Sequence, residues 1–217
     1  MREALTVHNV RAGYGQRTVL CGLAAEFPWA SVSAVLGPGG SGKSTLLRML
    51  AGATPELWCS GEIPRCEAWL LPQEIRSARR PELDPGLVTG ARAELQAWLA
   101  EHPTALTDEH REALQASARA LLRVARILAA QAEVLLLDEP DTDLDQPTSF
   151  ALAELLRSLA RAGRTILLVT HNLALVDQVA DHLVLLIDGV KLDEGPPARV
   201  RAQPASARVR DFFIWGA

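Results

Sequence analysis

Gly37-Pro38-Gly39-Gly40-Ser41-Gly42-Lys43-Ser44-Thr45 lies between two apolar segments. Residues 31–36 form an apolar run typical of a strand, and residues 46–51 continue as a helix. The segment from Gly37 to Ser44 satisfies the pattern G-x-x-x-x-G-K-[ST]. In this pattern glycines let backbone N–H groups turn inward around phosphates, and the following helix directs its positive end at them. Residues 37–45 are therefore predicted to bind a nucleotide.

Two side chains of this loop have specific predicted tasks. Lys43 supplies a compact positive charge to the outer phosphates, and the Ser44 hydroxyl can ligate Mg²⁺. The alternative is a flexible glycine turn. The pattern arises by chance in about one chain per hundred of this size, and a place between strand and helix is rarer still. The sequence therefore predicts ATP and Mg²⁺ as ligands.

Two acidic residues follow a second apolar run, residues 134–137. Such a run is typical of a buried parallel strand, and open α/β sheets bind ligands at the carboxyl ends of their strands. Neighbouring strand residues point to different sides. Asp138 is therefore predicted to hold the magnesium shell, and Glu139 to orient or deprotonate the attacking water. An exposed acidic turn after a core strand is the alternative.

Length and composition exclude several classes of protein. The chain has 217 residues, 48% apolar and 22% charged, which suits one globular domain over residues 1–217. A net charge of -4 gives no electrostatic reason to expect nucleic acid as a partner, because binding a phosphate backbone would need a basic face. Cys21, Cys59 and Cys66 match no common zinc spacing and are expected to be reduced thiols. No apolar run is long enough to span a bilayer.

The order of predicted elements indicates the fold class. Strands are predicted at residues 5–10, 18–27, 165–170, 182–187 and 189–192, the last two as a hairpin through Asp188-Gly189. Helices are predicted at residues 90–101, 107–130 and 148–162. We expect an α/β P-loop NTPase fold with a mostly parallel sheet, an N-terminal antiparallel strand region, and a helical subdomain inserted at about 76–130.

With these motifs the chain resembles the ATP-binding subunits of ABC transporters over essentially all of its length. Tyr14, in Gly13-Tyr14-Gly15, matches the family's adenine-stacking aromatic residue. Gln73 resembles the glutamine that contacts magnesium and links the site to the membrane partner. His171 matches the switch histidine that senses the γ-phosphate, and residues 141–145 match the family's D-loop. The resemblance implies that Glu139, His171 and Gln73 are catalytic and that Ser44, Gln73 and Asp138 hold the metal.

Each of the weaker matches also has an ordinary structural explanation. Tyr14 could be an aromatic residue of a turn, Gln73 a surface amide, and His171 a satisfied polar group at the end of a strand. Their order and spacing around the two strong motifs favour the functional interpretation.

The chain departs from the family at its signature, Leu-Ser-Gly-Gly-Gln. The usual spacing from Asp138 leads back to Leu114-Gln115-Ala116-Ser117-Ala118, which keeps only the leucine. Helix-start signals lie upstream at Thr107 and Asp108, so the expected helix runs through this place and lacks the anion-binding end that the family has there. We therefore predict a heterodimer in which a different ATPase subunit supplies an intact signature. A divergent but usable signature is the alternative.

The resemblance also implies a membrane-spanning transporter subunit as partner and a cytoplasmic position on the inner face of the membrane. The segment between Gln73 and Leu114 is short for the family, which predicts an unusual partner. Arg76, Arg79 and Arg80 in it form either a contact surface or, more simply, a solvated turn. The C-terminal residues 212–215 form either a docking patch or part of the core. Two other functions are a soluble ABC protein acting on DNA or ribosomes, and a regulatory ATP-binding module without hydrolysis.

Overall fold

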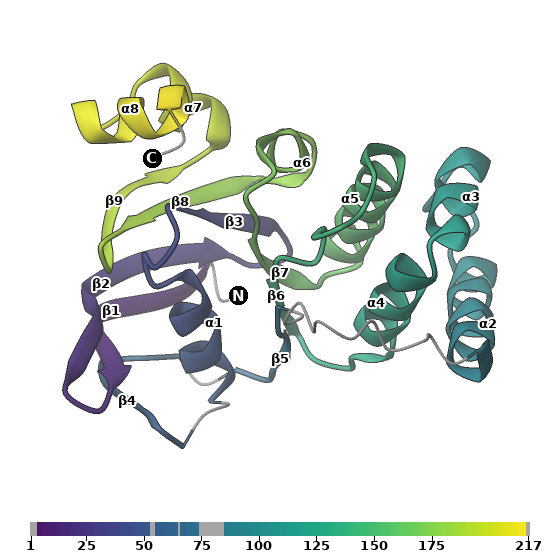
Figure 1. Ribbon diagram of the computed structural model, residues 1–217, viewed down its shortest axis with the longest axis horizontal. Helices are drawn as coiled ribbons and strands as arrows, with labels where there is room; N and C mark the ends of the chain where they lie inside the picture. Colours follow the sequence, from purple (N-terminus) through teal and green to yellow (C-terminus); the bar gives the residue numbers. More distant parts are fainter. Residues whose placement is uncertain (1–3, 53–54, 65, 74–84, 216–217) are drawn as a thin grey trace.

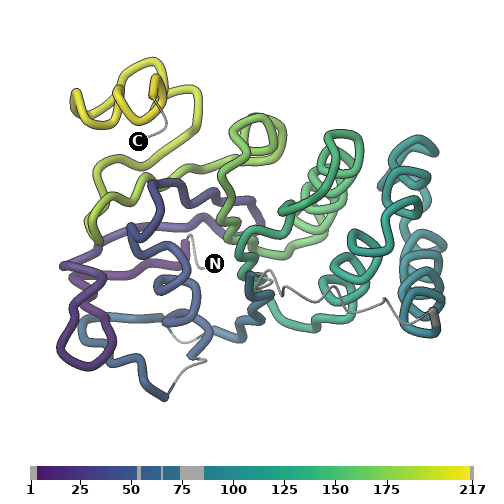
Figure 2. Tube along the Cα trace, viewed as in Figure 1, coloured from purple at the N-terminus to yellow at the C-terminus, as the bar shows by residue number. Residues whose placement is uncertain are grey.

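The computed structural model describes residues 4–52, 55–64, 66–73 and 85–215, and its backbone is drawn in Figures 1 and 2. The described residues form two β-sheets. One has six strands in the order β5-β6-β7-β3-β8-β9, and the other has three strands in the order β2-β1-β4. This mixed α/β arrangement confirms the predicted fold class.

The six-stranded sheet has its most apolar strands at its centre. Strands β3 (Val32–Leu36), β6 (Val134–Asp138) and β7 (Thr165–Val169) are buried along their whole length. They pair in parallel, and β5 (Ala68–Leu71) continues the parallel order at one edge. Strands covered on both faces need continuous apolar side chains. The carboxyl ends of β3 and β6 therefore meet at the same edge of the sheet.

The other edge of this sheet closes with a hairpin. Strand β8 (His182–Ile187) is parallel to β3, and β9 (Val190–Gly195) returns antiparallel to it. The turn between them holds Asp188 and Gly189 at φ values of 50° and 75°, as a two-residue hairpin requires. A Cβ atom on Gly189 would lie 1.9 Å from the Val19 carbonyl oxygen, so the turn also packs tightly against β2. The predicted hairpin is confirmed.

The three-stranded antiparallel sheet consists of β1 (Ala4–Tyr14), β2 (Arg17–Pro28) and β4 (Leu57–Glu62). Its first two strands confirm the predicted antiparallel region. Strands β4 and β5 were not predicted, because β4 is almost entirely exposed and β5 is only four residues long. Neither carries the alternating pattern from which a strand is inferred.

Helices cover both faces of the six-stranded sheet. Helix α1 (Lys43–Ala51) packs between this sheet and the antiparallel one, sharing a core with both. On the opposite face lies α5 (Gln146–Arg161), in a second core that extends into the helical part of the chain. Figure 1 shows this three-layered arrangement.

The helical part lies between β5 and β6 in the chain and at one end of the molecule, beyond α5 (Figure 1). It comprises α2 (Pro85–Glu101), α3 (Asp108–Ala116) and α4 (Ala118–Ala129). Its predicted limits, 76–130, remain a prediction, and residues 76–84, with Arg76, Arg79 and Arg80, lie outside the described residues.

The prediction of one helix over residues 107–130 is wrong. Ser117 leaves the helical conformation, with φ -104° and ψ 108°, and separates α3 from α4. Helix α3 packs mainly against α5, whereas α4 packs mainly against α2. One straight helix could not bury both apolar faces against those different neighbours. A serine hydroxyl can bond to nearby backbone groups, which makes this position a suitable breaking point.

The C-terminal segment packs partly against the sheet. Helices α6 (Leu173–Val179), α7 (Pro197–Ala202) and α8 (Ala207–Trp215) adjoin β8 and β9. In α8, Phe212 belongs to the core, whereas Ile214 and Trp215 are 57% and 78% exposed. Of the two alternatives for residues 212–215, packing into the core therefore holds for Phe212 but not for Ile214 and Trp215. Among the helices of the described residues, none combines the length and the apolar composition of a membrane span.

Candidate active site

The loop at residues 37–45 has a backbone that suits its predicted task. Gly37, Gly40 and Gly42 have φ values of 151°, 77° and 104°, which other residues rarely adopt. A Cβ atom at Gly37 would lie 1.9 Å from the Leu186 carbonyl oxygen. Gly42 immediately precedes α1, so the loop ends at the positive end of that helix. An anion in the loop would meet unpaired N–H groups of the first helical turn.

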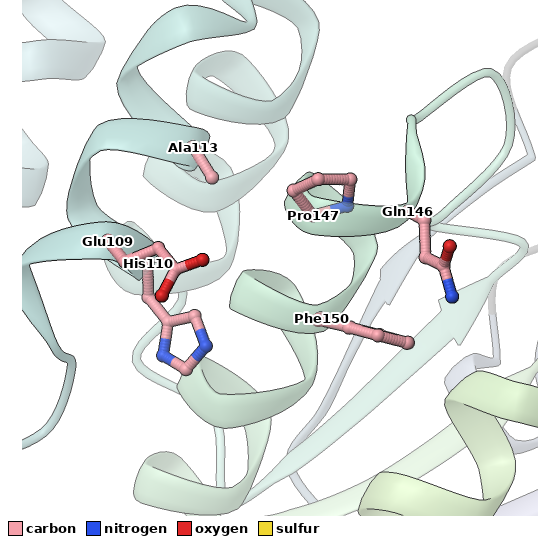
Figure 3. Close-up of a pocket in the computed structure, with 6 residues that line it drawn as sticks. All are labelled: Glu109, His110, Ala113, Gln146, Pro147 and Phe150. Carbon is pink, nitrogen blue, oxygen red and sulfur yellow. The ribbon is translucent and has the colours of Figure 1, made fainter.

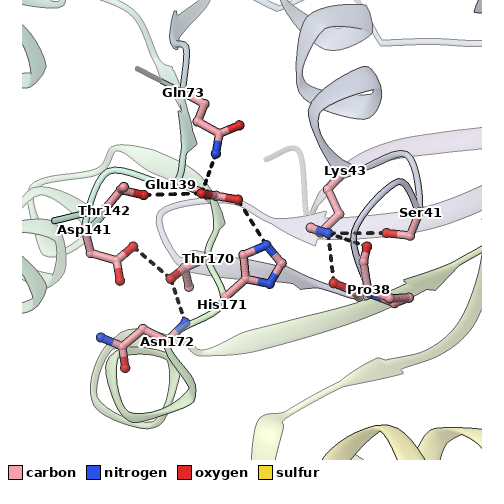
Figure 4. Close-up of polar contacts among 11 residues, drawn as sticks. Pro38, Ser41, Lys43, Gln73, Glu139, Asp141, Thr142, Thr170, His171 and Asn172 are labelled. Carbon is pink, nitrogen blue, oxygen red and sulfur yellow. Dashed lines mark hydrogen bonds and ion pairs between the residues drawn. The ribbon is translucent and has the colours of Figure 1, made fainter. Parts of the chain in front are cut away.

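Lys43 lies inside this loop. Its Nζ atom donates hydrogen bonds to the carbonyl oxygens of Gly37 and Pro38, each at 2.8 Å, and to Ser41 Oγ at 3.4 Å (Figure 4). Burial lowers the pKa of Lys43, and the charges of Glu139 and Asp138 partly oppose that shift. The ammonium group is thus held by the loop and lies near both acids.

Asp138 ends β6 next to the loop and is 3% exposed. Burial raises the pKa of its carboxyl group, and a hydrogen bond from the Ser44 side chain opposes that rise. Its Oδ1 atom is buried and has no hydrogen-bond partner among the described residues. A carboxylate and a hydroxyl side by side suit Mg²⁺, which is typically bound by few protein ligands and by the oxygen atoms of phosphates. Ser44 and Asp138 could hold the predicted metal.

The Glu139 carboxylate meets three other side chains, those of Gln73, Thr142 and His171 (Figure 4). Its Oε2 atom accepts a hydrogen bond from Gln73 Nε2 at 2.5 Å and one from Thr142 Oγ1 at 3.3 Å. Its Oε1 atom lies 3.0 Å from His171 Nε2. The structure therefore brings Glu139 together with Gln73 and His171. Sequence reasoning named no role for Thr142, although it lies within the D-loop segment.

A cavity of about 350 Å³ opens beside this group. It is lined by Glu139, Asp141, Thr142, Asp143, Thr170, His171 and Asn172. Thr170 Oγ1 donates to Asp141 Oδ1 at 2.8 Å and accepts from Asn172 N at 3.0 Å. Sequence reasoning assigned no role to Thr170, and its position directly before His171 was the available signal. The cavity gives space for a water molecule next to the Glu139 carboxylate.

Tyr14 lies apart from this group, at the end of the hairpin formed by β1 and β2. Its hydroxyl accepts a hydrogen bond from Arg48 of α1 at 3.4 Å. Trp58 of β4 stabilises the turn between β1 and β2, because its Nε1 atom donates a hydrogen bond to the Gly15 carbonyl oxygen at 2.9 Å. The role of Tyr14 against adenine remains a prediction.

A separate hollow of about 280 Å³ lies between α3 and α5. Figure 3 shows its lining residues, Glu109, His110, Ala113, Gln146, Pro147 and Phe150. None of the predicted site residues lines it, so the candidate active site is the group around β6 and the loop.

The segment at the expected signature starts a helix. The Ser117 side chain accepts a hydrogen bond from Ala120 N at 3.2 Å and so caps α4. The expectation that this place lacks a helix N-terminus is therefore wrong, although residues 114–118 lack the Gly-Gly pair of the family's signature.

Replacement of the cap tests this helix boundary. Ser117→Ala removes the acceptor for the Ala120 N–H group and should lower the free energy of unfolding by about 1 kcal/mol. Denaturation in urea measures the change, and Ser117→Asp should keep most of the stability because aspartate also caps helices. Equal stability of Ser117→Ala and the wild type would mean that the cap contributes nothing.

Comparison with known proteins agrees with this geometry. A family model described as "ABC transporter" matches residues 20–142. The chain belongs to the ABC transporter family. Membership in this ABC family confirms the resemblance seen in the sequence and the prediction of an ABC-type ATPase. A second model, described as an AAA domain and putative AbiEii toxin of a type IV toxin–antitoxin system, matches the smaller range 117–177.

Individual ABC proteins are similar over most of the chain. The Nod factor export ATP-binding protein I of Ralstonia nicotianae is 32% identical in an alignment 225 positions long, which covers 89% of this chain and 67% of that protein. The hemin import ATP-binding protein HmuV of Streptomyces coelicolor is 33% identical over 94% of this chain and 81% of its own. A nucleotide-free ATP-binding cassette from an ABC transporter has the same fold, with a TM-score of 0.65 at 17% identity, covering 98% of this chain and 99% of that one.

Proposed function

We propose that this ABC ATPase binds ATP with Mg²⁺ and uses its hydrolysis to drive a separate membrane-spanning transporter subunit. Two observations support this proposal: Lys43 is held inside the phosphate loop by the carbonyls of Gly37 and Pro38, and Glu139, directly after β6, contacts Gln73 at 2.5 Å and His171 at 3.0 Å. Mg²⁺ would be held by Ser44 and Asp138, with Gln73 nearby. When bound, Mg²⁺ neutralises developing charge on the phosphates.

The protein side chains have separate tasks in the proposed hydrolysis. Residues 37–42 and Thr45 enclose the phosphates, with backbone N–H groups from all of these residues except Pro38, and Lys43 adds a positive charge. Glu139 accepts a proton from, or orients, the attacking water. His171, 3.0 Å from Glu139, holds the carboxylate on the side of the cavity and contacts the terminal phosphate. Tyr14 stacks on adenine, since an aromatic ring offers a flat apolar face.

A membrane-spanning partner is supported by the relatives, which are ATP-binding proteins for Nod factor export and hemin import. Those names include both export and import, so no cargo and no direction of transport are assigned to this chain. We place the chain in the cytoplasm, against the inner face of the membrane. The charge of -4 remains the reason to expect no nucleic-acid partner.

We also infer that a second ATPase subunit pairs with this chain, and that the pair is a heterodimer. The supporting observation is the absence of the Gly-Gly pair from residues 114–118. The helix start at Ser117 weakens this inference, because the N–H groups of Ala118 and Arg119 can bind an anion without glycine. The homodimer with a divergent signature is therefore the alternative to be tested.

Purification of the tagged chain from its own cells tests the partners. We expect a membrane-spanning protein and a second, different ATPase subunit to copurify, and the chain purified alone to show little cooperative ATPase. Vigorous turnover by the isolated chain would contradict the heterodimer. Recovery of ribosomes or nucleic acid would contradict transport, and recovery of only a soluble partner would favour the regulatory function.

A further inference from the structure

Arg123 connects the helical part of the molecule to the turn that follows Glu139. It lies on α4 and is 3% exposed, although arginine is rarely buried unless it is paired. Its NH1 atom donates hydrogen bonds to the carbonyl oxygens of Pro140, at 3.1 Å, and Thr142, at 2.6 Å. A planar guanidinium group can satisfy several acceptors in a fixed geometry. Arg123 thus holds the carbonyls on both sides of Asp141.

The turn held by Arg123 also fixes the Glu139 carboxylate. Thr142 N donates to the Glu139 carbonyl oxygen at 3.2 Å, and Thr142 Oγ1 donates to Glu139 Oε2 at 3.3 Å. Thr142 therefore contacts both the backbone and the side chain of Glu139, while Arg123 holds the carbonyl of the same threonine. A displacement of Thr142 would move a hydrogen-bond donor of the carboxylate.

The backbone of this turn is strained and needs support. Glu139 and Asp143 have φ values of 51° and 62°, in a region that residues other than glycine rarely adopt. Such residues cost free energy and persist only where their surroundings fix them. Asp141 is fixed from the sheet side by Thr170. Arg123 supplies the corresponding bonds from the helical side.

We propose that Arg123 is a positioning residue for ATP hydrolysis, which acts through the carbonyls of Pro140 and Thr142 to aim Glu139 at the attacking water. Arg123 does not line the cavity beside Glu139, so it acts through the turn and not on the substrate. The proposal rests on the proposed function in one respect, since it takes Glu139 as the residue that activates water. It adds that the position of α4 determines how well Glu139 can do so.

The test compares Arg123→Leu and Arg123→Lys in the ATPase complex copurified with its partners. Arg123→Leu removes the hydrogen bonds to the Pro140 and Thr142 carbonyls and should lower kcat by about 10- to 100-fold, because small displacements of a catalytic group have effects of this size. Affinity for a fluorescent ATP analogue should stay within about twofold, since the phosphate loop is unchanged. Arg123→Lys keeps the charge but not the planar fork and should lose less activity.

Arg164→Leu is a matched control, because Arg164 also holds two backbone carbonyls. It donates to Ala130 and Ala132, before the start of β6 and thus at the opposite end of the strand from Glu139. We expect Arg164→Leu to lower the melting temperature and to leave kcat per folded molecule within about twofold of the wild type. A general loss of stability therefore cannot imitate the expected effect of Arg123→Leu.

A double-mutant cycle with Thr142→Val tests the connection itself. If Arg123 acts through Thr142, the effect of Thr142→Val on kcat should be at least about twofold smaller in the Arg123→Leu background. Strict additivity, or a kcat within about twofold of the wild type for folded Arg123→Leu, would overturn the proposal. If Arg123→Leu does not fold, Arg123→Lys decides by the same criterion. A wild-type complex without ATPase activity would instead contradict the proposed function.

Discussion

Glu139→Gln is expected to bind ATP as tightly as the wild type while turnover falls by about 100-fold or more, the usual contribution of a general base. Glutamine has nearly the same shape as glutamate but cannot accept the proton of the attacking water. The phosphate loop does not contact the substituted group in any described hydrogen bond, so binding should not change. Single-turnover hydrolysis and titration with a fluorescent ATP analogue measure the two quantities separately.

Glu133→Gln is the matched control for this substitution. Glu133 is exposed and lies directly before β6, at the end of the strand opposite Glu139. The same chemical change there should leave kcat within about twofold of the wild type. Normal hydrolysis by Glu139→Gln would remove Glu139 from the catalytic assignment and with it the basis of the proposal for Arg123.

Lys43→Ala is expected to weaken ATP binding itself, by about 100-fold or more. A hydrogen bond to a charged group contributes about 1.5–3 kcal/mol, and a buried ammonium can make several with phosphate oxygens, each 1.4 kcal/mol being tenfold in affinity. The loop that surrounds Lys43 would also lose the hydrogen bonds to Gly37 and Pro38 that the ammonium makes. Equilibrium titration with an ATP analogue measures the loss.

Lys191→Ala controls for the removal of a lysine. Lys191 lies on β9 and pairs with Glu194 at 2.5 Å, outside the residues of the candidate site. Its variant should bind ATP with wild-type affinity. If Lys43→Ala bound ATP as well as Lys191→Ala does, the loop at residues 37–45 would not be the nucleotide site, and the function proposed for this chain would fail.

The features predicted correctly from sequence have local causes. The phosphate loop is a contiguous run, and its glycines specify the backbone conformation wherever the chain goes afterwards. Strands β3, β6 and β7 are apolar along their length, which is typical of strands covered on both faces. The position of Asp138 at the same edge of the sheet as the loop also followed from sequence, because the carboxyl ends of all parallel strands in one sheet lie at one edge.

Predictions failed or were missing where neighbours distant in sequence determine the local structure. Strand β4 is nearly all exposed, and its position depends on pairing with β1. The break at Ser117 depends on α3 and α4 packing against different helices, which helical periodicity alone does not show. The roles of Thr142 and Thr170 became visible only from their contacts with Glu139 and Asp141.

The amino-acid sequence by itself determined the fold family, the nucleotide loop and the two acids at the end of β6, because contiguous residues and strand order fix each of them. The tertiary structure decided which side chains surround Glu139 and where the helical segment breaks. It also placed Arg123 of α4 on the carbonyls of Pro140 and Thr142. These contacts join residues far apart in the chain, and only the packing of helices against the sheet sets the distances between them.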